Sequence, residues 1–110
     1  MEEQDVDRII DINGISVRSV ILLIERLRQT ETPNQFYCRE VELDDAYRHA
    51  DVDFRLAESD EQDNVDEFRL VREHVIRAHD LVGESNVSAA VAELSRIVEI
   101  KIGLGETETT

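Results

Sequence analysis

Apolar residues recur at helical spacing along almost the whole chain. In the first segment they alternate in steps of four and three, which places them on one stripe of a long helix over residues 4–30. The stripe consists of Val6, Ile10, Asn13, Val17, Val20, Ile24 and Leu27. This spacing is typical of a coiled-coil seam. Additional apolar residues beside the stripe predict a helix that is buried on more than one side.

Gly14 interrupts this first helical pattern. A glycine within a helix costs about 1 kcal/mol relative to alanine, and Asn13-Gly14 could instead end a short first helix as a left-handed cap. If the helix is continuous, Asn13 falls at a core position, where one polar residue can fix register and oligomeric state. Both versions are compatible with the pattern.

A second helix is predicted to begin near residue 33. Thr32 suits the N-cap, Pro33 suits the first helical position, and Gln35 completes a capping box. The apolar positions of this helix form one inner stripe, made of Phe36, Leu43, Tyr47, Ala50, Phe54 and Ala57. The polar run over residues 58–64 ends it.

Two further helices complete the pattern. The third begins near Val65 and ends at Gly83, where a C-cap glycine is expected, and the fourth is capped by Ser85 or Asn86 and stops at Gly103. Residues 1–103 are therefore predicted to form a single helical domain, and residues 104–110 a flexible tail.

These elements predict an all-α fold, an antiparallel helical bundle of about four helices with a long first helix. Short connections force consecutive helices to run antiparallel. The extra apolar faces of the first and fourth helices indicate a second partner surface, most simply that of a homodimer. The predicted self-association residues are Val17, Val20, Ile24 and Leu27.

Charge restricts the possible partners. The chain carries 26 acidic and 12 basic residues, a formal net charge of −14. Direct nucleic-acid binding needs clustered Lys and Arg, and an anionic membrane would repel the chain. The charge instead favours another protein with a basic surface.

The cysteine count and the first residues predict a cytoplasmic protein. Cys38 is the single cysteine, so no disulfide can form within the chain, and the start Met1–Asp5 lacks the basic residues and apolar run of a signal peptide. Cys38 near the start of a helix could have an activated thiol, but a structural thiol is the simpler interpretation.

No catalytic or cofactor-binding motif is present in the sequence. Asp45, His49 and Asp53 lie four residues apart and would stack along one helical face. Dedicated transition-metal sites usually need three or four ligands with supporting contacts, and a solvated acidic face is the better explanation of this spacing. We therefore expect no metal site and no cofactor.

His79 carries the one family resemblance. The segment Ala78-His79-Asp80-Leu81-Val82-Gly83 resembles the His-x-Leu-Lys-Gly motif of histidine-containing phosphotransfer domains, with matches at His79, Leu81 and Gly83. The resemblance implies a helical bundle with His79 as phosphoacceptor and Gly83 leaving room for a partner. Val82 stands where that family has lysine. The alternative interpretation is a histidine near a helix C-terminus that interacts with the helix dipole.

Together these features predict a non-enzymatic, small acidic helical protein that acts through protein–protein interaction as a regulator, adaptor or chaperone. Two alternatives are a phosphotransfer module using His79 and an acidic inhibitor that imitates nucleic acid.

Overall fold

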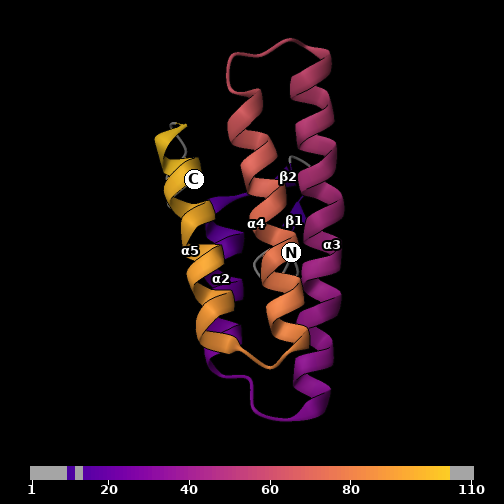
Figure 1. Cartoon of the computed structure of the whole chain (residues 1–110), viewed down its shortest axis with the longest axis vertical. Helices are drawn as coiled ribbons and strands as arrows, with labels where there is room; N and C mark the ends of the chain where they lie inside the picture. Colours follow the sequence, from indigo (N-terminus) through magenta and orange to yellow (C-terminus); the bar gives the residue numbers. More distant parts are fainter. Residues whose placement is uncertain (1–9, 12–13, 105–110) are drawn as a thin grey trace.

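A computed structural model describes residues 10–11 and 14–104 of the chain. Within these residues it contains a two-stranded hairpin and four α-helices in an all-α, four-helix bundle-like arrangement (Figure 1). The elements are β1 (Ile10–Asp11), β2 (Gly14–Ile15), α2 (Val17–Arg28), α3 (Pro33–Ser59), α4 (Val65–Gly83) and α5 (Val87–Gly103). None of these helices has both the length and the apolar character needed to cross a membrane.

Successive helices run antiparallel, but their order in space differs from their order in the chain. α4 packs between α3 and α5, whereas α2 packs mainly against α5 and only slightly against α3 (Figure 1). The β1–β2 hairpin contacts α3 instead. The hairpin therefore supplies packing contacts to α3, with which α2 makes few contacts.

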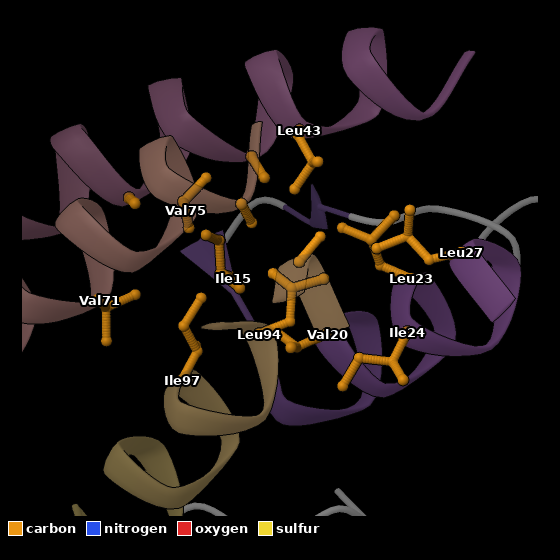
Figure 2. Packing of buried hydrophobic residues seen from close by; sticks show 14 of the residues in the cluster. Ile15, Val20, Leu23, Ile24, Leu27, Leu43, Val71, Val75, Leu94 and Ile97 are labelled. Atoms are coloured by element: carbon orange, nitrogen blue, oxygen red, sulfur yellow. The ribbon is translucent and has the colours of Figure 1, made fainter. Parts of the chain in front are cut away.

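All four helices and β2 contribute to one apolar core (Figure 2). Ile15 of β2 is buried together with leucines, isoleucines and valines of the helices. The largest fully buried side chains are Leu23, Leu27, Leu43, Leu94, Ile97, Val17, Val75 and Val82. Close packing of these aliphatic side chains provides the main favourable term for folding.

The predicted first helix over residues 4–30 is wrong at residues 10–11 and 14–15. Ile10–Asp11 and Gly14–Ile15 are antiparallel strands, with Ile10 opposite Ile15 and Asp11 opposite Gly14. The helix begins only at Val17, because the side chain of Ser16 accepts a hydrogen bond from the Ser19 backbone N–H at 3.1 Å. Neither version of the helical prediction at Gly14 is correct. Val6 and Asn13 lie outside the described residues.

The predicted start of the second helix is confirmed at α3. The Thr32 side chain accepts from the Gln35 N–H at 3.2 Å, and the Gln35 side chain accepts from the Thr32 N–H at 3.0 Å. This capping box and Pro33 at the first helical position fix where α3 begins. Of the predicted inner stripe, Phe36 and Tyr47 are only partly buried.

The predicted bounds of α4 and α5 are also confirmed. Asn86 caps α5 by accepting from the Ala89 N–H at 3.2 Å. At the end of α4, however, the left-handed residue is Ser85, with φ 61°, and not Gly83. A side chain at Gly83 would instead approach Glu40 of α3, since an added Cβ would lie 3.3 Å from the Glu40 carboxylate. A larger residue at Gly83 would therefore require the Glu40 carboxylate to shift by a few tenths of an ångström.

Candidate functional site

The last turn of α3 and its connection to α4 carry a group of exposed carboxylates. Glu58, Asp60, Glu61 and Asp63, here named the acidic tip, are all exposed. Glu61 adopts a left-handed conformation with φ 55°, which helps the chain to turn after α3. In Figure 1 this connection stands beyond the described ends of α2 and α5. The acidic tip is thus accessible from several directions.

Below the tip, arginines and carboxylates from α3 and α4 form a partly buried network. The carboxylate of Asp51 accepts hydrogen bonds from Arg72 of α4 and, at 2.8 Å, from Arg55 of α3. These hydrogen bonds, that of Arg72 first, hold the pKa of the Asp51 carboxyl below its usual value. Asp51 therefore stays ionised and joins the two helices.

The ring of Phe54 supports the same cations. The guanidinium carbon of Arg72 lies 4.3 Å from the ring centroid and that of Arg69 lies 5.4 Å from it. Both distances suit cation–π contacts. Arg69 also pairs with Asp66. The arginines nearest the tip already face a carboxylate, an aromatic ring or both.

The four tip carboxylates, by contrast, form no ion pair within the described part of the chain. Within that part of the chain no cation neutralises them, and a negatively charged surface attracts cationic groups over about a Debye length, about 8 Å at physiological salt. The α3–α4 hairpin is held together by the hydrogen bonds of Asp51 and the contacts of Phe54, and its end carries a negative surface that attracts cations.

No protein-family model matches the chain. No significant match was found among curated proteins or solved structures either. The assignment of a site consequently rests on the geometry of these residues alone.

The predicted self-association residues lie in the interior of the fold. Val17, Val20, Ile24 and Leu27 of α2 are all buried. Val20, Ile24 and Leu27 belong to the shared apolar core (Figure 2). Self-association through this seam stays a prediction, and it would require α2 to leave its place against α5.

The spacing of Asp45, His49 and Asp53 does not develop into a metal site within the described residues, which hold no cluster of three or more metal-ligating side chains. His49 Nδ1 lies 3.0 Å from the Asp45 carbonyl oxygen and 3.9 Å from the Asp45 carboxylate. These contacts support α3 locally.

Cys38 is a free, exposed thiol on α3.

His79 lies on α4 with its side chain 32% exposed and its Nδ1 3.7 Å from the Asp80 carboxylate. Gly83 is one helical turn further along. Gly83 lines a hollow between α3 and α4, together with Tyr37, Glu40 and Ser85. Phosphotransfer through His79 stays a prediction, and the charged residues that line the hollow beside Gly83 in the described part of the chain are Glu31 and Glu40.

Two polar pairs were not identified from the sequence. His74 is buried between α4 and α5, and its Nδ1 lies 2.6 Å from the Glu93 carboxylate. Asp51 and Arg72 likewise join α3 to α4. Partners separated by about twenty positions leave no local spacing signal. These pairs could have been suggested only by assuming how α3, α4 and α5 pack together and which residues of neighbouring helices lie at the same level.

Proposed function

We propose that the chain is a non-enzymatic interaction protein whose acidic tip recruits a partner protein with a basic surface. The observation that carries the proposal is the contrast at the end of the α3–α4 hairpin. The arginines there are engaged with Asp51, Asp66 and Phe54, whereas the tip carboxylates pair with no cation of the described residues. A basic partner would supply the missing counter-charges.

The same contrast suggests how binding would proceed. Uncompensated carboxylates speed encounter with a cationic surface by long-range attraction, and this contribution falls as salt increases. The Asp51–Arg72 bridge and the Phe54 contacts hold the hairpin in one conformation, so little ordering is needed on binding. The role that follows is that of a regulator or adaptor.

The proposal is tested by neutralising the tip. The variant Glu58→Gln/Asp60→Asn/Glu61→Gln/Asp63→Asn removes four charges at one place. A matched control removes four exposed charges elsewhere, by Glu25→Gln, Glu31→Gln, Glu84→Gln and Glu99→Gln. Proteins captured from native cells by the immobilised wild-type chain would be purified, and their affinity for all three chains measured by titration calorimetry.

The tip variant is expected to bind the purified partner at least about tenfold more weakly than the matched control, because neighbouring charges act together while scattered ones act mainly through net charge. Equal affinities of the two variants would overturn the assignment to the tip.

An inhibitor that imitates nucleic acid would use the same surface, and competition between the chain and a DNA duplex for the partner would reveal it.

A further inference from the structure

The outer face of α3 carries apolar side chains directly opposite the core. Tyr37, Val41, Val52 and Leu56 are exposed by 66%, 50%, 52% and 57% respectively. The buried residues of the same helix, which include Ala46 and Ala50, lie on the other side. Val41 and Val52 are three helical turns apart and share one face. Single exposed apolar residues are ordinary, but a row of them on one helix face marks an interaction surface.

Two charged residues occupy the middle of this row. Asp45 and Arg48 are exposed and lie between Val41 and Val52. Arg48 pairs with Asp44 at 2.9 Å, but both side chains are more than half exposed and such pairs contribute little to stability. Arg48 is therefore free to exchange this contact for another carboxylate. The six residues Tyr37, Val41, Asp45, Arg48, Val52 and Leu56 are here named the α3 outer face.

The α3 outer face is symmetric about the point between Ala46 and Tyr47. Val41 and Val52 lie equally far from this point along the helix, and so do Tyr37 and Leu56. Asp45 and Arg48 form the innermost pair and have opposite charges. Two antiparallel helices related by a two-fold axis bring such mirror positions to the same level. An apolar residue then meets an apolar one, and a carboxylate meets a guanidinium.

We propose that the α3 outer face binds a second copy of this chain, with the two α3 helices antiparallel. Val41 of each copy packs at the level of Val52 of the other, and Tyr37 at the level of Leu56. Asp45 of each copy pairs with Arg48 of the other, so the contact contains two intermolecular ion pairs. This surface is separate from the acidic tip, and the self-association does not depend on the proposed function.

The affinity of this dimer is limited by size and charge. A contact restricted to one helix face is at the low end of interface areas, so we expect a dissociation constant in about the micromolar range. Each copy also carries a net charge of −14, which opposes association until salt screens it. Dimerisation should therefore depend on protein concentration and strengthen with salt.

A charge exchange tests the pairing. In sedimentation equilibrium at fixed salt, Asp45→Arg and Arg48→Asp are each expected to raise the dissociation constant at least about tenfold, since each places like charges together twice. The double variant Asp45→Arg/Arg48→Asp restores opposite charges and should return to within about threefold of wild type. The two single variants change the net charge in opposite directions, so general repulsion cannot explain weakening in both.

A disulfide experiment tests the orientation independently. In a Cys38→Ser background, Val41→Cys/Val52→Cys is expected to form a covalent dimer on mild oxidation. Within one chain the two positions are about 16 Å apart along α3, beyond the reach of a disulfide. The control Leu70→Cys/Ile76→Cys introduces two cysteines at exposed apolar positions of α4 and should form no covalent dimer.

The possible results separate the two proposals. A wild-type chain that stays monomeric at all concentrations and salts overturns the dimer, as does a dimer that is insensitive to both single charge variants. Cross-linking of Val52→Cys alone as efficiently as the pair would overturn the antiparallel orientation. The tip-neutralised variant should dimerise at least as strongly as the wild type, because it loses four of the charges that oppose association. A missing basic partner and a missing dimer are therefore distinct outcomes.

Discussion

At the scale of single residues, Asp51 shows how hydrogen bonds from two arginines set a protonation state. Its carboxylate faces Arg72 and Arg55, and the resulting pKa lies below the ordinary value. A lowered pKa means that the folded state favours the ionised form more strongly than the unfolded state does. This contribution to stability is fully present above the unfolded pKa of about 3.9 and is lost as the pH falls through the folded pKa.

Asp51→Asn is therefore expected to destabilise the protein by about 1 kcal/mol at pH 7 and by less at pH 3, where the wild-type carboxylate loses its advantage. The measurement is the free energy of urea unfolding at both pH values. Asp44→Asn, which alters a more exposed ion pair, is the control and should show a smaller effect at pH 7. An equal loss at both pH values for Asp51→Asn would contradict the ionic explanation.

His74 and Glu93 form the second polar contact that depends on the folded structure. Their short contact joins α4 to α5 at a site where the His74 side chain is 10% exposed. Removing Glu93 leaves the buried His74 without this partner, and removing His74 leaves the partly buried Glu93 without it. We expect His74→Leu and Glu93→Leu each to cost about 1–3 kcal/mol. The double variant should cost clearly less than the sum. Strict additivity in this double-mutant cycle would show that the pair is not coupled.

At the scale of elements, the N-terminal hairpin is the main departure from the predicted fold. Ile15 was not part of the predicted seam, yet it is buried in the same apolar core as Leu43 and Val75 (Figure 2). Ile15→Ala is expected to cost about 2–4 kcal/mol of unfolding free energy, as for other buried isoleucines. Ile21→Ala, at a partly buried position of α2, is the control and should cost less. Chemical denaturation of the two variants gives the comparison.

The bounds of α3, α4 and α5 could be predicted because local residues encode them. Thr32, Pro33 and Gln35 define one start, the polar run after Ala57 defines one end, and Gly103 defines another. The first helix could not be predicted in the same way, since apolar residues at positions 10 and 15 fit both a helix and a strand. The turn signal Asn13-Gly14 and the capping residue Ser16 favour a hairpin followed by a helix.

The candidate sites were less accessible to sequence reasoning than the helices. The acidic tip follows directly from residues 58–63, but its lack of compensation depends on Arg69 and Arg72 turning toward Phe54. The α3 outer face could have been found from sequence, because Val41 and Val52 repeat at helical spacing away from the inner stripe. Its interpretation required knowing that no other part of the described chain covers it.

At the scale of the whole molecule, the two proposed surfaces respond to salt in opposite directions. Recruitment of a basic partner at the acidic tip weakens as salt screens the attraction, whereas self-association of two chains of charge −14 strengthens as salt screens their repulsion. Sedimentation of the wild-type chain between about 0.05 and 0.5 M salt should show a rising dimer fraction. A falling fraction would indicate that ion pairs, and not apolar contact, dominate the self-interface.

The placement of α2 against α5 has a consequence for biosynthesis. α3 and α4 can form their hairpin as soon as both have emerged, but the apolar side of α2 must wait until α5 has been synthesised. At about 5–20 residues per second this interval lasts several seconds, during which Leu23 and Leu27 have only part of their final surroundings. A nascent chain stalled before α5 would expose these leucines, and we would expect molecular chaperones to bind it there.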